Sequence, residues 1–262
     1  MSVSTPPVND RIALQRWLPY CRLDAGRPRV RLLCFAHAGG SAFVFQKWPE
    51  KLPWTVQVCA VQLPGREQRL NEPFVKHMPK LIEELSHALL SWMDRPVALL
   101  GHSLGAKIAF EFARCIRSQV GAPEIVHLFV SGSRAPHLRP SAELPIYNLP
   151  EEQFVQRLRQ FGGTPQDVLA DSEIMQFLAP RLRSDFELDN TYTFEPRHPL
   201  ACPITAWAGD SDGLVPAASL QDWGQHTTGV FQAHILKGAH FSFYERECEI
   251  IPRIRQALSG HP

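Results

Sequence analysis

Short apolar runs recur along the chain and have the length and composition of buried strands. Between several of them, apolar residues repeat instead at helical spacing, as in residues 81–92 and 104–116. Strands that alternate with helices predict an α/β protein with a mostly parallel sheet covered by helices on both faces. The six runs span residues 29–36, 55–62, 96–100, 125–131, 203–208 and 230–236.

The alternation stops between about residues 134 and 197, where the pattern is helical and rich in turns. This stretch lies between the fourth and fifth predicted strands, so it predicts a helical lid inserted into the domain. Gly162 and Gly163 would allow the lid to bend, although a permanently packed subdomain fits the same pattern. We expect one domain over residues 1–262, with the lid at about 134–197.

The composition is that of a soluble globular protein, with 44% hydrophobic and 20% charged residues. The first residues lack the basic and apolar segments of a secretory signal, and no later segment approaches the ~18 apolar residues that a membrane helix needs. A cytoplasmic protein is therefore expected. The six cysteines are scattered without a CxxC pair, so neither a metal site nor a disulfide framework is predicted.

The net charge is only +1, which argues against a general attraction to nucleic acid. The charge is unevenly distributed, because residues 1–70 hold ten Lys and Arg against four Asp and Glu, giving +6 there and −5 in the remainder. This asymmetry is compatible with an ordinary solvated surface. It is also compatible with a docking face for an acidic or phosphorylated partner.

The sequence GHSLG places Ser103 between Gly101 and Gly105, directly after an apolar run and before a helical pattern. A strand, a tight turn and a helix with a serine at the apex form a nucleophile elbow. The motif alone is weak evidence, and its position between strand and helix makes it stronger.

A serine hydroxyl needs a base, and the base needs a carboxylate to orient it. His240 follows the last predicted strand and is the preferred base, with His226 and His234 as rivals. Asp212 follows the fifth strand in GxxDxxVP and is the preferred acid, with Asp210 as the alternative. The chain order serine, aspartate, histidine is that of the α/β-hydrolases.

An acyl-transfer site also needs two N–H donors for the oxyanion. One would be the N–H of Leu104, directly after the serine. The second should come from the loop after an early strand, where FAHAGGSA at residues 35–42 makes Ala38 the candidate. A plain glycine turn is the alternative interpretation of this loop.

Together these segments resemble the stand-alone type II thioesterases that accompany nonribosomal peptide and polyketide synthases. The matching segments are FAHAGGSA, LPGREQR, GHSLGA, GDSDGLVP and GAHFSF, which together span most of the chain. The combination of HAGGSA with PGRE is much more specific than GHSLG, which many hydrolases share.

The resemblance implies an α/β-hydrolase fold with a lid, and hydrolysis of short or aberrant acyl groups from the phosphopantetheine arm of carrier proteins. Ser103 would be the nucleophile, His240 the base, Asp212 its orienter, and Ala38 and Leu104 the oxyanion donors. No cofactor, nucleic acid or membrane is implied; the partners would be acyl or peptidyl carrier domains, which the basic first third could meet, and the expected state is a monomer.

Two departures and two alternatives accompany this interpretation. Lys107 stands where relatives are expected to have an apolar residue, and Arg66 and Arg69 receive no catalytic role. The same triad would also serve a carboxylesterase or acyltransferase acting on small oxyesters. A hydrolase-fold binding protein without turnover is the alternative from another class.

Overall fold

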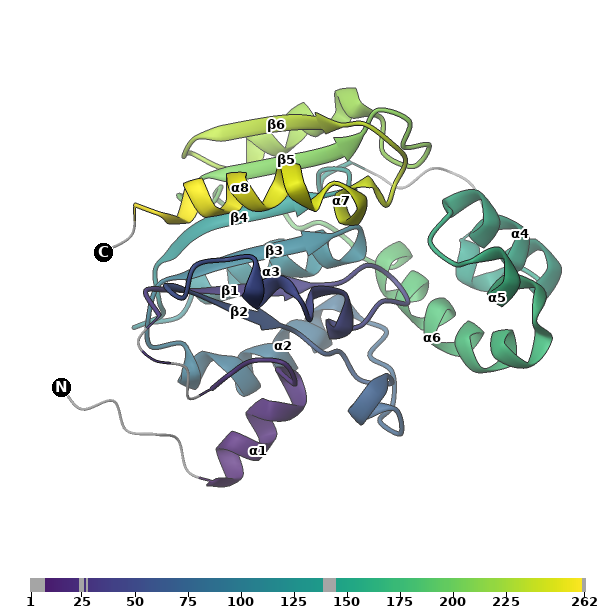
Figure 1. The fold of residues 1–262 in the computed structure, drawn as a ribbon, viewed down its shortest axis with the longest axis horizontal. Helices are drawn as coiled ribbons and strands as arrows, with labels where there is room; N and C mark the ends of the chain where they lie inside the picture. Colours follow the sequence, from purple (N-terminus) through teal and green to yellow (C-terminus); the bar gives the residue numbers. More distant parts are fainter. Residues whose placement is uncertain (1–7, 24–25, 27, 139–144, 261–262) are drawn as a thin grey trace.

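The computed structural model describes residues 8–23, 26, 28–138 and 145–260, and its core is a six-stranded, wholly parallel sheet (Figure 1). The strand order is β2-β1-β3-β4-β5-β6. All six predicted strands are confirmed, and the parallel sheet confirms the predicted fold class. The strands are β1 Val30–Phe35, β2 Val56–Ala60, β3 Val97–His102, β4 Ile125–Ser131, β5 Ile204–Gly209 and β6 Phe231–Leu236.

The strand order reverses once, at β1. The chain runs from β1 outward to β2, then crosses back to β3 on the other side of β1. The loops that leave the carboxyl ends of β1 and β3 therefore diverge, and such a switch point is where open α/β sheets bind ligands. The register aligns the two ends, because Phe35 of β1 lies opposite Gly101 of β3.

Helices cover both faces of the sheet, as the alternating pattern predicts. On one face, α1, α2 and α3 pack against strand residues such as Leu33 and Leu99. On the other, α7 and α8 pack against residues such as Leu32 and Leu100 (Figure 1). Neighbouring strand residues thus bury their side chains in different layers. The helices are α1 Val8–Trp17, α2 Met78–Leu89, α3 Leu104–Arg117, α7 Ser242–Glu245 and α8 Glu247–Leu258.

Between β4 and β5 the described residues form helices and no strand. The helices α4 Glu151–Phe161, α5 Gln166–Ala170 and α6 Ser172–Asn190 lie together beyond one end of the sheet (Figure 1). They have a separate apolar core that includes Phe154, Leu158 and Leu182. We call residues 145–197 the helical insertion; residues 139–144 of the predicted lid lie outside the described residues.

Three of the four carboxylates of helix α6 form ion pairs with cations of the sheet domain. The first pair is almost completely buried, with both side chains 3% exposed, and the other two are more accessible. Exposed pairs contribute little to stability, whereas removing one partner of the buried pair would leave a costly lone charge in the interior. The pairs are Asp185–Arg66 at 2.7 Å, Glu187–Lys76 at 2.8 Å and Asp189–Lys107 at 2.7 Å.

No helix in the described part of the chain is both long and apolar enough to cross a bilayer. The six cysteines are free thiols, among which the sulfur atoms of Cys21 and Cys59 lie 3.4 Å apart in the core. The first seven residues, on which the expectation of no signal segment rests, lie outside the described residues.

Candidate functional site

Ser103 stands at the turn between β3 and α3, in a backbone conformation that non-glycine residues rarely adopt. Its φ is +55° and ψ is −121°, a strain of about 1–3 kcal/mol that neighbouring structure must hold. The flanking glycines make the turn possible. A Cβ on Gly101 would lie 2.0 Å from the carbonyl oxygen of Gly105, and one on Gly105 would lie 2.2 Å from that of Phe35.

The structure brings Ser103, His240 and Asp212 together in one chain of hydrogen bonds. Ser103 Oγ and His240 Nε2 lie 3.1 Å apart, and His240 Nδ1 lies 2.8 Å from Asp212 Oδ2. An ionised carboxylate can only accept, so Nδ1 carries the proton and Nε2 is free to accept from the serine hydroxyl. This is the arrangement needed to take a proton from an attacking alcohol.

The environment of Asp212 keeps its carboxylate ionised. Burial acts to raise its pKa, but the hydrogen bond with His240 and the charge of that ring lower it, and the net pKa is below the ordinary value. The backbone N–H groups of Leu214 and Val215 contribute by donating to Oδ1 at 2.8 and 3.1 Å. One oxygen therefore orients the histidine while the other fixes the loop.

Asp210, the alternative acid, lies elsewhere in the same loop. Its Oδ1 accepts from the backbone N–H of Gly238 at 2.9 Å and from Ser211 Oγ at 2.8 Å, and its side chain is exposed. The geometry therefore favours Asp212 as the partner of His240. Asp210 connects the two loops that carry Asp212 and His240.

In the described part of the chain, the two rival histidines make their contacts away from Ser103. His234 lies on β6, with its ring 6.1 Å from that of Trp207. His226 is buried, and its Nε2 lies 2.8 Å from Nδ1 of His137. His240 is the histidine that the fold places at the elbow.

We expect His226 to make the stability of the protein dependent on pH. Burial, followed by the nearby charges of His137 and Arg114, lowers the pKa of His226 to about 4, whereas an unfolded histidine titrates near ~6.5. The unfolded chain binds the proton first, so the contribution of His226 is complete above ~6.5 and is lost as the pH falls toward about 4.

Urea unfolding at about pH 7 and about pH 5 should therefore show a lower free energy of unfolding at the lower pH. His226→Gln should reduce the difference between the two measurements. An identical pH dependence in wild type and variant would contradict this role of His226.

Two further histidines, His102 and His37, lie near His240; the sequence analysis did not single them out. The His102 ring lies 5.1 Å from that of His240 and stacks on Phe243 at 5.5 Å, and the His37 ring lies 6.0 Å from His102. Burial, with the nearby charge of His240, lowers the pKa of His37 to about 3 and that of His102 well below its ordinary value. Both rings stay neutral, and His240 is the one whose hydrogen bond to a carboxylate can stabilise a positive charge.

The two candidate oxyanion donors lie on the loops after β1 and β3. Leu104 is the first residue of α3, and Ala38 lines the same pocket as Ser103 and His240. The turn at residues 37–40 is closed by the N–H of Gly40, which donates to the His37 carbonyl at 2.9 Å. The third residue of the turn, Gly39, has φ +77°, as a type II turn requires.

A pocket of about 420 Å³, open to solvent, lies between Ser103 and the helical insertion. Part of this volume is continuous with bulk solvent. The wall opposite Ser103 is apolar and comes from α4 and α6, with more apolar surface from the loops that carry Asp212 and His240. These lining residues are Leu158, Phe161, Leu182, Phe186, Leu214 and Phe241.

Part of the positive charge of residues 1–70 is neutralised inside the fold. Arg31, Arg66 and Arg69 are buried and paired with Asp94, Asp185 and Glu72. Arg29 is exposed but precedes β1, at the opposite edge of the sheet from Ser103, and Arg27 lies outside the described residues. A docking face formed by the other cations, which include the exposed Arg16 and Lys47, stays a prediction.

Lys107, which stands where an apolar residue is expected in relatives, makes an ion pair and a ring contact. Its ammonium forms the ion pair with Asp189 and lies 5.8 Å from the centre of the Tyr192 ring. The polar residue at this position therefore attaches α3 to α6.

Among the described residues, no group of three or more His, Cys, Asp or Glu is placed to hold a metal ion.

Two curated proteins are similar to this chain along most of its length. GrsT, a gramicidin S biosynthesis protein of Aneurinibacillus migulanus, is 41% identical over 238 residues, which cover 91% of this chain and 92% of GrsT. Linear gramicidin dehydrogenase LgrE of Brevibacillus parabrevis is 38% identical over 253 residues, or 95% of each chain. The name of LgrE denotes a dehydrogenase, but this sequence contains no Gly-x-Gly of the kind that binds a dinucleotide.

A solved structure also aligns along most of the chain. The type II thioesterase BorB from the borrelidin biosynthetic cluster superposes with a TM-score of 0.81 and 34% identity, covering 89% of this chain and 94% of BorB. Residues 30–258 match the thioesterase domain family. With its wholly parallel sheet and serine elbow, the chain belongs to the thioesterase domain family of α/β-hydrolases, enzymes that act on thioesters.

Proposed function

We propose that this thioesterase hydrolyses acyl groups from the phosphopantetheine arm of carrier proteins that belong to a nonribosomal peptide or polyketide synthase, and so removes aberrant acyl units. The observation that carries the proposal is the hydrogen-bonded chain Ser103–His240–Asp212 beneath an apolar pocket. Similarity to GrsT and BorB, whose names refer to such biosynthetic systems, supports the substrate class.

The first half of the reaction forms an acyl-enzyme. Ser103 Oγ attacks the thioester carbonyl carbon while His240 Nε2 takes the hydroxyl proton, and the carbonyl electrons move onto oxygen. The N–H groups of Ala38 and Leu104 would stabilise this oxyanion. When the carbon–sulfur bond breaks, the sulfur leaves with the bond electrons and the proton from His240, and the acyl group remains on Ser103.

The second half uses water in the same way. The water oxygen attacks the carbonyl carbon of the acyl-Ser103 ester while His240 takes a proton from that water. His240 then returns a proton to Ser103 Oγ as the carboxylic acid leaves. A thiol, with a pKa near ~8.5, needs less protonation to depart than an amine does. The triad therefore meets a modest demand at the leaving-group step.

The helical insertion supplies the apolar wall of the pocket and would act as the lid over the bound acyl chain. Such a wall favours an apolar acyl group, since its burial removes apolar surface from water. The proposal needs no cofactor, and it includes a monomeric enzyme in the cytoplasm, where it would meet carrier domains as separate partners.

The decisive comparison uses one acyl group in two linkages. We compare an acyl thioester on a carrier protein with a small oxyester of the same acyl group that has no carrier. We expect kcat/KM for the thioester to exceed that for the oxyester by at least ~10²-fold, since binding of the carrier contributes to transition-state stabilisation. A preference for the oxyester would instead identify a carboxylesterase. Absence of labelling of Ser103 by a fluorophosphonate would favour a binding protein without turnover.

A further inference from the structure

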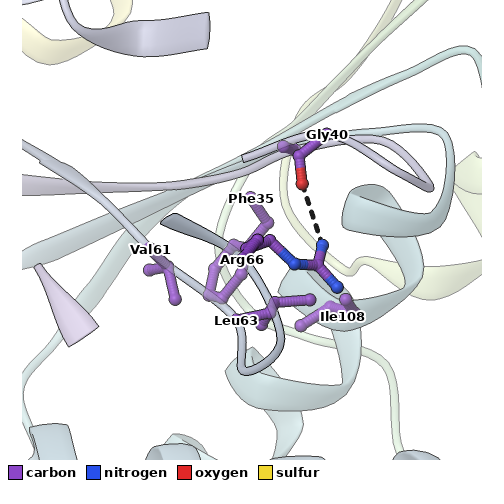
Figure 2. Close-up of a pocket in the computed structure, with 7 residues that line it drawn as sticks. Phe35, Gly40, Val61, Leu63, Arg66 and Ile108 are labelled. Carbon is purple, nitrogen blue, oxygen red and sulfur yellow. Dashed lines mark hydrogen bonds between the residues drawn. The ribbon is translucent and has the colours of Figure 1, made fainter. Parts of the chain in front are cut away.

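The loop after β1 is held from two sides by one buried ion pair. On one side, the N–H of Gly39 donates to Asp185 Oδ2 at 2.7 Å. On the other, Arg66 donates to the Gly40 carbonyl at 2.8 Å, as Figure 2 shows. The two side chains meet through paired hydrogen bonds of 2.7 and 3.1 Å. Successive backbone groups of the turn are therefore tied to a rigid bidentate pair.

Packing and polar contacts together hold this part of the loop. The space beside Gly40 and Arg66 is small, with a free volume of about 10 Å³, and it is bounded by apolar residues that include Val61, Leu63 and Ile108 (Figure 2). A Cβ on Gly39 would lie 2.3 Å from Cδ2 of Leu182, so the Leu182 side chain packs closely against this glycine. The hydrogen bonds to the backbone of Gly39 and Gly40 add a directional restraint to this packing.

The position of this turn bears directly on the oxyanion site. Gly39 N belongs to the peptide that follows Ala38, so its hydrogen bond to Asp185 fixes the orientation of that peptide plane. The adjacent peptide carries the Ala38 N–H, whose orientation is limited by the closed turn. Stabilisation of an oxyanion depends on donors being placed before the charge develops.

We infer that Asp185 and Arg66 are positioning residues that hold the Ala38 N–H in place for the oxyanion. The inference rests on the proposed acyl-serine function. Neither residue contacts the reacting atoms; each acts through the backbone of residues 39 and 40. The helical insertion thus contributes to the chemical step through α6, in addition to lining the pocket.

The test separates transition-state from ground-state binding. In Asp185→Asn, the amide NH2 cannot accept from Arg66, so the bidentate pair is lost and the turn is displaced. We expect kcat to fall by ~10–100-fold with KM changed by less than ~3-fold, since a displaced donor affects the transition state. An acyl trifluoromethyl ketone forms an oxyanion adduct with Ser103. Its inhibition constant should rise by a similar factor. Inhibition by the matched thioether, which forms no oxyanion, should stay unchanged.

Two further variants separate positioning from stability. Arg66→Met/Asp185→Leu removes both charges together, so it avoids a lone buried charge and is expected to fold. It has no acceptor at position 185 for Gly39 N–H, so it should show at least the same loss of kcat and ketone affinity, and it is the decisive variant if Asp185→Asn unfolds. Glu187→Gln, which removes another ion-pairing carboxylate of α6, is the matched control and should behave as wild type.

The outcomes distinguish the inference from the proposed function. If wild type forms the ketone adduct and hydrolyses thioesters while a folded variant retains both properties, the positioning role is wrong and the function stands. If wild type hydrolyses no thioester, the proposed function fails, and ketone affinity in the variants still tests the positioning of the donor.

Discussion

Replacing Ser103 with alanine should reduce kcat by at least ~10⁴-fold, since loss of a triad nucleophile leaves only the catalysis supplied by binding and the oxyanion donors. The change removes one oxygen atom from a residue whose backbone N–H is held by the Ser131 carbonyl at 2.8 Å. The fold should persist, and the melting temperature should be close to that of wild type.

The measurement is single-turnover hydrolysis of an acyl-carrier thioester, together with labelling by a fluorophosphonate. The variant should show neither an acyl-enzyme nor a label. Near-normal turnover by a correctly folded Ser103→Ala protein would show that another group attacks the thioester and would remove the basis of the proposed mechanism.

The second large effect is expected for Asp212→Asn, with kcat reduced by ~10⁴-fold. An amide at this position can donate to His240 Nδ1, which favours the tautomer whose Nε2 carries the proton and cannot accept from Ser103. KM should change little, because Asp212 is absent from the pocket lining.

Asp210→Asn is the matched control, two residues away in the same loop. Asparagine can still accept from Gly238 N–H and Ser211 Oγ, so activity should stay within ~3-fold of wild type. The reverse result, with Asp210→Asn inactive and Asp212→Asn active, would assign the triad acid to Asp210. Rates measured across pH would show in addition whether the histidine still acts as the base.

The sheet could be predicted because its signals are local. Each strand is a short apolar run, and the helical repeats of α2 and α3 place buried residues such as Leu81, Leu85 and Ile108 at regular spacing. The elbow was also visible, since Gly101 and Gly105 are required by contacts within a few residues or with the adjacent strand end. Strand order was beyond such signals, because it depends on which distant segments pair.

The contacts that support the loop after β1 could not be predicted in this way. Asp185 lies within an otherwise ordinary polar and apolar helix, 119 residues from Arg66, and nothing in its local pattern distinguishes it from Glu187 or Asp189. Which of the cations in residues 1–70 remain accessible could not be predicted for the same reason. Charge was counted along the chain, whereas the carboxylates that pair with Arg31 and Arg66 come from other parts of it.

The three ion pairs between α6 and the sheet domain distinguish two parts of the pocket wall. Leu182 and Phe186 stand on a helix anchored to the sheet domain, whereas Leu158 and Phe161 stand on α4, whose residue Glu151 is paired with Arg183 of α6 itself. Remodelling α4 would therefore reshape the space for the acyl chain and leave the anchored wall in place. Substrate range and catalytic rate are to that extent separable traits, and engineering for longer or bulkier chains should begin at Phe161, since Leu158 belongs to the apolar core of the insertion.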